Sequence, residues 1–463
     1  MLEQSSATPV RNSFAFWREL AARDPELAAD ELLRRATAPQ ESRSAIAGLR
    51  SREQMAQQFA SALTAPASQD SAQPQRLAAV PYLLKDLFDV RGELTGCSSL
   101  LLPKIGAPAG KDSHVQRAVV SAGAVYVGRT HMNEFAYGFD GKNAHFGTCP
   151  NPHDPLRIAG GSSSGSAWAV GKGIVPLAFG TDTGGSVRVP AAFCGLFAFR
   201  RGVDQWASDG VFPLARSFDT AGWFTSLPGD MAEALRALWE ATPGAPDGSE
   251  GWESRHAGGR TGVLYLPGEV PLEAGLADQS MRVAELLGAV LDPSLQQELD
   301  AMLPDCTMAY DVIGSIEAYE AHAEWIDRYK DLYDPVVWAR IERARRWSPD
   351  DIERARLLKQ RMEQFIRQVL ERYDFLAMPA TPMYAPLIAT PDAEYRTSTL
   401  MLAVPASLAG TPVLTIPLSH APADPSGPAV RSERLSLGGL QILVSSERAS
   451  HAREILERLP RSW

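Results

Sequence analysis

The chain has 463 residues, which is enough to bury a large core in one or more domains. Hydrophobic residues make up 45% of the sequence and charged residues 22%, as in folded globular proteins rather than disordered ones. The net charge of −10 argues against non-specific binding to nucleic acid or to an anionic membrane surface, because both require basic patches.

The cysteines and the apolar segments indicate a cytoplasmic protein. Cys97, Cys149, Cys194 and Cys306 lack CxxC spacing, so we expect reduced structural cysteines rather than a disulfide framework or a zinc site. Residues 1–11 lack a basic stretch followed by an apolar one, and we expect no signal peptide. The longest apolar runs are too short to span a bilayer. We therefore expect neither a membrane nor a nucleic acid as partner.

The N-terminal part is predicted to be helical. Leucines recur near helical spacing in residues 12–62, and residues 64–76 are a polar linker without periodicity. We therefore expect an N-terminal helical segment and linker at residues 1–76, followed by one large domain at residues 77–463.

Strands and helices alternate after residue 77. Buried strands are predicted at 79–84, 124–128 and 174–179, and a helix capped by Ser113 is predicted at 113–122. This alternation predicts an α/β core at about 77–225 with a mixed or parallel sheet.

The second half of the chain combines helices with a return of strands. A surface loop is predicted at 240–260 and a helical insertion at about 270–375, with the clearest periodicity at 338–373. Short strands are predicted at 375–378, 413–416 and 440–444, before a last helix at about 450–459. Because strands flank the insertion, we expect one mixed central β-sheet surrounded by helices.

Two loops of small residues carry the unusual chemistry, at residues 160–166 (GGSSSGS) and 180–186 (GTDTGGS). Both lie between predicted core elements, where a flexible linker is not expected. Rigid glycine loops occur where backbone approaches a ligand closely or where several N–H groups converge on one point. The loops therefore predict a site.

Glycine-rich loops of this kind also occur in two other types of site. A phosphate-binding loop requires G-x-x-x-x-G-K-[ST] or G-x-G-x-x-G after a strand, and neither is present. Residues 161–165 satisfy G-x-S-x-G with Ser163 as the nucleophile. That elbow should join a strand to a helix, whereas the sequence before it is typical of a loop.

The two loops and the lysine strand at residues 80–86 (VPYLLKD) together resemble the amidase signature family. The resemblance runs from about residue 77 to 223, with shorter similarities at 378–382, 410–417 and 439–442. It implies the amidase signature fold and hydrolysis of an amide by a serine–serine–lysine triad, through an acyl-enzyme and without a cofactor.

The resemblance implies a role for each matching residue. Ser186 is the nucleophile, Ser162, which follows a cis peptide in this family, is the bridging serine, and Lys85 is the base. The family's oxyanion hole corresponds to the backbone N–H groups of Thr183, Gly184, Gly185 and Ser186.

The chemistry constrains the environment of the lysine. A serine hydroxyl needs a base, and a lysine base must be neutral, so burial must lower its pKa from about 10.4. The end of an apolar strand supplies that burial for Lys85. Asp86 need not touch Lys85, since adjacent strand residues point to opposite faces.

Three neighbours of the triad are interpreted as supporting residues. Asp182 and Arg188 are expected to form a buried structural pair that holds the loop, and Ser163 is expected to support Ser162 by hydrogen bonding. The histidines lack the spacing of a metal site, so we expect no metal.

The substrate is expected to be a small carboxylic amide that yields an acid plus ammonia or an amine. Residues 85–90, 141–148 and 217–224 resemble the indole-3-acetamide hydrolases, although residues 201–206 replace a Pro-Ser-His-Gly-like turn. An amidase subunit of a tRNA-dependent amidotransferase, and a non-catalytic relative that binds a ligand, are the alternatives. The oligomeric state is open, with a homodimer as one candidate.

Overall fold

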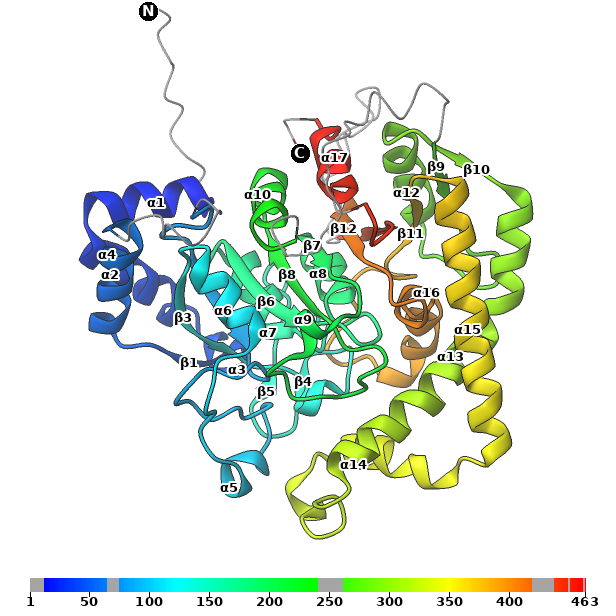
Figure 1. Cartoon of the computed structure of the whole chain (residues 1–463), viewed down its shortest axis with the longest axis horizontal. Helices are drawn as coiled ribbons and strands as arrows, with labels where there is room; N and C mark the ends of the chain where they lie inside the picture. Colours follow the sequence, from blue (N-terminus) through cyan, green and yellow to red (C-terminus); the bar gives the residue numbers. More distant parts are fainter. Residues whose placement is uncertain (1–11, 65–74, 240–260, 419–436, 449, 461–462) are drawn as a thin grey trace, which may run out of the picture.

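A mixed β-sheet of eleven strands runs through the molecule and carries helices on its faces (Figure 1). The computed structural model describes residues 12–64, 75–239, 261–418, 437–448, 450–460 and 463. The strands of this sheet are β1 (Ile46–Leu49), β2 (Pro81–Lys85), β3 (Val125–Thr130), β6 (Leu177–Thr181), β7 (Phe197–Arg200), β8 (Ala221–Thr225), β9 (Gly262–Leu264), β10 (Ala289–Leu291), β11 (Leu376–Pro379), β12 (Val413–Pro417) and β13 (Gly439–Leu443). A separate hairpin consists of β4 (Lys142–Asn143) and β5 (Gly147–Thr148).

The helices of the first half are α1 (Phe14–Arg23), α2 (Pro25–Thr37), α3 (Ser42–Ala45), α4 (Arg52–Thr64), α5 (Leu102–Ile105), α6 (His114–Ser121), α7 (Ser164–Gly171), α8 (Arg188–Cys194), α9 (Gln205–Ser208) and α10 (Pro228–Leu238). Those of the second half are α12 (Leu276–Leu286), α13 (Pro293–His322), α14 (Pro335–Glu342), α15 (Pro349–Arg372), α16 (Arg396–Leu408) and α17 (His451–Glu457).

The strand order is β1-β3-β2-β6-β8-β7-β12-β13-β11-β9-β10. The pairs β3–β2, β2–β6, β11–β9 and β9–β10 are parallel, and the other pairs are antiparallel. The predicted α/β fold with a mixed central sheet and surrounding helices is therefore confirmed. Strands from before and after the helical insertion lie in one sheet, as expected.

The sequence predicted six strands of the sheet and missed the others. The predicted strands correspond to β2, β3, β6, β11, β12 and β13. The helical prediction for residues 12–62 is wrong at β1, whose four residues are too short to display an alternation. The linker predicted at 64–76 and the loop predicted at 240–260 fall largely or wholly outside the described residues. The division of the chain at residue 76 stays a prediction.

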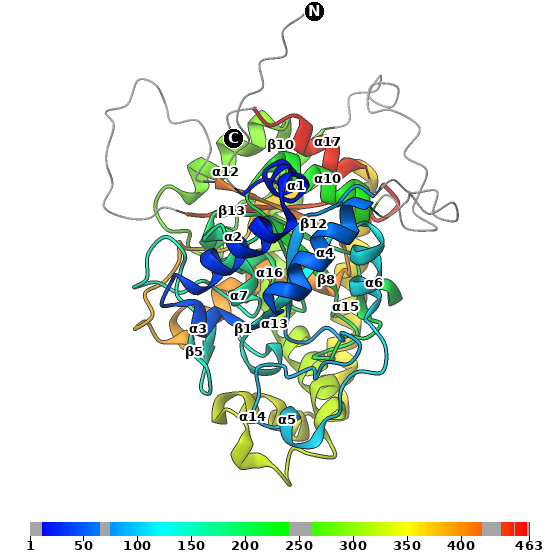
Figure 2. The ribbon, with the colours of Figure 1, turned by 90° about the vertical axis from the view of Figure 1, so that its left-hand side faces the viewer.

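The N-terminal helices cover the β3 end of the sheet. In Figure 2, α1, α2 and α4 lie in front of the sheet edge. Trp17 on α1 is fully buried and stacks on Phe59 of α4, with 6.3 Å between ring centroids. Both side chains belong to a cluster that also contains Leu83 and Val127 from the sheet. The N-terminal segment thus shares a core with β2 and β3.

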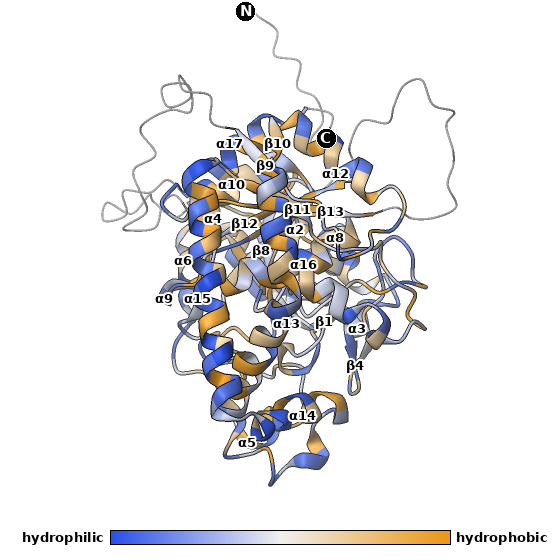
Figure 3. Ribbon diagram, turned by 90° about the vertical axis from the view of Figure 1, so that its right-hand side faces the viewer, coloured by the Kyte–Doolittle hydropathy of each residue, from blue (hydrophilic) through white to orange (hydrophobic). Residues whose placement is uncertain are grey.

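The long helices of the second half have strong start signals. Before α13, α14 and α15 stand Asp292, Asp334 and Ser348, each followed by proline, and each side chain accepts a backbone N–H of the first turn. Ser348 forms a full capping box with Asp351. Figure 3 shows polar and apolar residues alternating along α15, and its buried residues face α13 and α16.

The alternation along β2 positions its last residue. Tyr82 and Leu84 belong to one hydrophobic cluster of the sheet and Leu83 to another. Because side chains alternate between the faces of a strand, Lys85 follows Leu83 to the face that α7 covers. β2 therefore places Lys85 near the N-terminus of α7, where the first glycine–serine loop ends.

Candidate active site

Lys85 is fully buried at the end of β2 and contacts both loops. Its Nζ lies 2.7 Å from the Oγ of Ser162 and 2.9 Å from the Oγ1 of Thr181. Burial lowers the pKa of Lys85 to about 7, and the negative charges of Asp182 and Asp219 oppose this shift only in part. A large fraction of this lysine is therefore neutral near pH 7.

Asp86 does not hold Lys85 in its charged form. Its carboxylate accepts the backbone N–H groups of Gly96 and Ser98 and lies 3.6 Å from the guanidinium of Arg129. The structure thus confirms that the neighbouring acid is occupied on the other face of the strand.

Ser162 is the residue of the first loop that contacts Lys85. The Gly161–Ser162 peptide is cis, as the resemblance implied for the bridging serine. The Ser162 carbonyl accepts the backbone N–H of Asn133 at 3.3 Å, and its hydroxyl meets Lys85.

Ser163 connects the two loops rather than supporting Ser162. Its N–H donates to the carbonyl of Ser186 at 3.2 Å, and its hydroxyl donates to the carbonyl of Thr181 at 3.2 Å. Within residues 75–239, which are described without a gap, its side chain makes no hydrogen bond to Ser162. The expectation of direct support is wrong, because the start of α7 turns the Ser163 hydroxyl toward β6.

The elbow interpretation of Ser163 does not fit this geometry. Between β5 and α7 the chain has no strand, so no strand-to-helix turn exists at Ser163. The Ser163 hydroxyl is buried and bonded to a carbonyl instead of being displayed at the top of the sheet.

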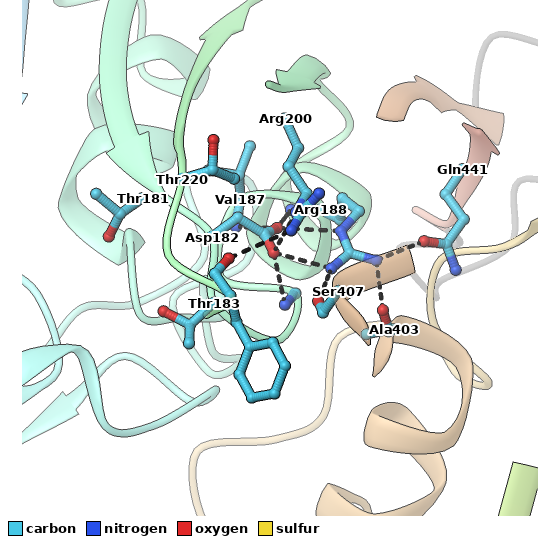
Figure 4. Close-up of polar contacts among 12 residues, drawn as sticks. Thr181, Asp182, Thr183, Val187, Arg188, Arg200, Thr220, Ala403, Ser407 and Gln441 are labelled. Carbon is cyan, nitrogen blue, oxygen red and sulfur yellow. Dashed lines mark hydrogen bonds and ion pairs between the residues drawn. The ribbon is translucent and has the colours of Figure 1, made fainter. Parts of the chain in front are cut away.

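The Asp182 carboxylate fixes the backbone of the second loop by hydrogen bonds and ion pairs. It accepts the backbone N–H groups of Gly185, Val187 and Arg188. Figure 4 shows it facing the guanidinium groups of Arg188 and Arg200, at 2.8 and 3.2 Å. Burial by itself would raise the pKa of Asp182, but the two arginines hold it well below its usual range. The expected buried pair of Asp182 and Arg188 is present, with Arg200 as a partner that the sequence did not indicate.

Arg188 extends this network to the second half of the chain. Its guanidinium donates to the carbonyl of Ala403 at 2.6 Å, the hydroxyl of Ser407 at 2.9 Å and the Oε1 of Gln441 at 2.8 Å (Figure 4). Residues of α16 and β13 thereby fix the loop that begins at β6.

The backbone N–H groups of the loop differ in availability. In the described residues 75–239, the N–H groups of Thr183, Gly184 and Ser186 make no hydrogen bond. The Gly185 N–H donates to Asp182 at 2.9 Å. The prediction that Gly185 contributes to an oxyanion hole therefore does not fit this structure, because its donor is already used.

Glycines let the loop pass closely under its neighbours. A Cβ on Gly184 would lie 2.5 Å from the hydroxyl oxygen of Tyr310 on α13. Gly185 has a φ of +121°, and a Cβ there would lie 2.9 Å from that of Ala403. Side chains at these positions would collide with α13 or α16.

Sequence reasoning missed three residues of this site. Thr181 contacts Lys85, and Asp219 accepts the hydroxyl of Thr183 at 2.6 Å. Burial raises the pKa of Asp219 to about 6. Both residues lie in segments already singled out, so their position was a usable signal. Tyr310 lies in the helical insertion, where periodicity indicated only a core residue.

The described residues contain no cluster of three or more His, Cys, Asp or Glu side chains that could hold a metal ion. All four cysteines are buried and free. Over the same described ranges, no helix has the length and apolar character required to cross a membrane.

Removing one partner of the buried ion pair should unfold the protein more easily. We expect Arg188→Ala to lower the free energy of unfolding by about 3–5 kcal/mol, because it leaves the buried Asp182 carboxylate short of positive charge. Denaturant titration followed by circular dichroism measures this change.

The matched control is Arg354→Ala, which removes an exposed pair with Asp305 at 3.1 Å. It should change the unfolding free energy by less than about 1 kcal/mol. Equal effects of the two substitutions would contradict the structural role of Arg188.

Comparison with known proteins agrees with this geometry. The sequence matches the family described as Amidase over residues 28–442. It is 30% identical over 385 residues to Amidase 1 of Arabidopsis thaliana, a match that covers 78% of this chain and 90% of the relative. It is 31% identical over 379 residues to the 1-carboxybiuret hydrolase subunit AtzE of Pseudomonas sp. (strain ADP), covering 74% and 77%. A crystal structure of an amidase superposes with a TM-score of 0.77 at 25% identity, covering 96% of this chain and 98% of that one.

Proposed function

The protein belongs to the amidase family and hydrolyses carbon–nitrogen bonds of amides, and from this premise we propose that Lys85, Ser162 and Ser186 form its catalytic triad. The observation that carries the proposal is the 2.7 Å contact between the Lys85 Nζ and the Ser162 Oγ in a fully buried site. A lysine with a pKa of about 7 can accept a proton at neutral pH, which an ordinary lysine does poorly.

In the first half of the reaction, the Ser186 oxygen attacks the carbonyl carbon of the amide. Ser162 accepts the proton of Ser186 as it gives its own proton to Lys85. The developing oxyanion receives hydrogen bonds from the free N–H groups of Thr183, Gly184 and Ser186. One such donor is typically worth about 3–4 kcal/mol in the transition state.

In the second half, the carbon–nitrogen bond breaks as the proton returns from Lys85 through Ser162 to the leaving nitrogen. This step releases ammonia or an amine and leaves an acyl-enzyme on Ser186. A water molecule then attacks the ester and gives its proton through Ser162 to Lys85. The bond from the carbonyl carbon to the Ser186 oxygen breaks as that proton returns to this oxygen, and the carboxylic acid leaves.

The substrate proposed for this site is a small carboxylic amide. Membership of the indole-3-acetamide hydrolase group stays a prediction, supported by the 30% identity to Amidase 1 and by the segments around Lys85 and Asp219. The cytoplasmic location and the homodimer also stay predictions.

A second candidate function is that of a subunit within a larger enzyme. One relative carries the name of a hydrolase subunit, and an amidotransferase subunit would use the same triad. Release of ammonia from simple amides by the purified chain alone, without tRNA or a partner, would favour the free-standing hydrolase. Activity only with a partner present would favour the subunit.

Ser186 should be the residue that reacts covalently. We expect a fluorophosphonate to label Ser186, and Ser186→Ala to lower kcat by roughly a thousandfold or more while the protein stays folded. Peptide mapping by mass spectrometry and amide hydrolysis assays measure these effects. Ser163→Ala is the matched control, since it removes only the hydrogen bond to the Thr181 carbonyl. It should keep the label on Ser186, and labelling of Ser163 would refute the assignment.

The ionisation of Lys85 should control the acid side of the pH profile. Because the neutral amine is the active form and its pKa is about 7, kcat/KM should rise with pH to a plateau above about pH 8. Lys85→Arg should not restore activity, because a guanidinium stays protonated in this range. Lys111→Arg, at an exposed lysine, is the matched control and should keep the wild-type profile.

Asp219 also titrates in this range, since burial raises its pKa to about 6. Asp219→Asn separates the two groups. The acid limb should persist and move to lower pH, because the variant removes a negative charge that raises the pKa of Lys85. An acid limb that disappears in an active Asp219→Asn protein would assign the ionisation to the carboxyl instead.

A further inference from the structure

Arg396 is a cation without an anionic partner. It lies near the second glycine–serine loop, residues 180–186, which we call the nucleophile loop because it ends at the proposed nucleophile Ser186. Arg396 is the first residue of α16 and makes no hydrogen bond or ion pair with any described residue. Its Nε is buried and unpaired. Its guanidinium lies over the ring of Phe139, with 5.6 Å between the Cζ and the ring centroid.

The neighbours of Arg396 place it next to the site of attack. The Cε1 of Phe139 lies 3.6 Å from the position that a Cβ on Gly185 would occupy. Tyr310, whose hydroxyl lies over Gly184, is also close to the guanidinium. Burial raises the pKa of the Tyr310 phenol, and the positive charge of Arg396 opposes that shift.

Two carboxylates near Arg396 already pair with other arginines, although the Oδ1 of Asp392 is buried without a hydrogen bond to a described residue. Asp311 accepts two hydrogen bonds from Arg343, at 2.6 and 3.1 Å. Asp392 pairs with Arg340. Three arginines therefore face two carboxylates, which leaves one positive charge in excess (3 − 2 = 1).

A third carboxylate nearby does not change this balance. Asp140 accepts the side-chain amide of Asn133 at 2.7 Å, and the Nζ of Lys142 lies 3.9 Å from it. The unpaired cation is thus Arg396, whose guanidinium lies over Phe139, and Phe139 in turn lies against Gly185 of the loop that ends at Ser186.

A largely buried guanidinium is costly to leave without an anion, and its planar donors match a carboxylate. We infer that Arg396 binds a carboxylate of the substrate, so that the acyl part of the cleaved amide carries a negative charge a few bonds from the scissile carbonyl. This inference rests on the proposed function of Ser186. A neutral aryl-acetamide would leave Arg396 without an anion. Its binding would bury the unpaired guanidinium further, which would lower the affinity.

Matched substrate pairs test the inference. Malonamate, succinamate and glutaramate each differ from their diamide only by a carboxylate in place of an amide. For the chain length that fits, we expect wild-type kcat/KM for the carboxylate to exceed that for the diamide by roughly 10- to 100-fold, after correction for the two equivalent amides.

Substitution of Arg396 should remove this preference. Arg396→Gln should lower the carboxylate-to-diamide ratio of kcat/KM by about the same factor, and Arg396→Lys should keep part of it, because the charge remains but the planar donors are lost. Arg354→Gln, at an exposed arginine of α15, is the matched control and should leave the ratio unchanged.

Two results would overturn the inference. One is a wild-type preference for the diamides, or for a neutral amide such as phenylacetamide, over every carboxylated substrate. The other is an unchanged ratio in a folded Arg396→Gln protein. If that variant does not fold, or if no test amide is cleaved, a labelling experiment on the wild-type protein tests the inference instead. It measures whether malonate, succinate or glutarate protects Ser186 from the fluorophosphonate. Protection supports the inference, and its absence rejects it. No cleavage of any amide together with no label on Ser186 would instead refute the proposed function.

Discussion

Asp182, at the end of β6, is a buried carboxylate that accepts hydrogen bonds from three N–H groups of its own loop and faces two arginines. Such a group is costly to bury unless its charge and its lone pairs are satisfied. Its satisfaction requires the loop, β7 and α8 to meet at one point. Through Arg188, the same requirement reaches α16 and β13. Because these contacts fix the loop on both sides of Ser186, the burial of the Asp182 carboxylate determines where Ser186 lies.

This arrangement also supports the proposed role of Lys85 as the base. A carboxylate free to pair with Lys85 would keep the amine protonated. Asp182 is instead occupied by arginines, and Asp86 is occupied by backbone N–H groups and Arg129 on the other face of β2. Lys85 keeps only hydroxyl and carbonyl neighbours. The ion pairs of the site hold the loop while the unpaired lysine remains available for proton transfer.

The helical second half supplies the wall of the site. Tyr310 of α13 lies against Gly184, whose N–H is free, and Ala403 of α16 lies against Gly185. The catalytic loops and this wall are separated by more than a hundred residues in the chain, and one sheet joins them because β11, β12 and β13 extend the strands of the first half. The residues that face the substrate from the helices can therefore vary without disturbing the contact between Lys85 and Ser162.

The sequence by itself determined the α/β class, the longer buried strands, the two glycine–serine loops and the buried pairing of Asp182 with Arg188, because these depend on local patterns of apolar, glycine and charged residues. Only the tertiary structure decided that β1, β7 and β8 join the sheet, since they pair with β3, β12 and β6, which lie far from them in the chain. It also decided that the Gly185 N–H is already used, that Ser163 bonds to Thr181, and that Arg200 and Asp219 meet the loop. These facts depend on distances between residues far apart in the chain. The same holds for Arg396, which looks like an ordinary surface charge in the sequence and becomes an unpaired cation only when α16 packs against the nucleophile loop.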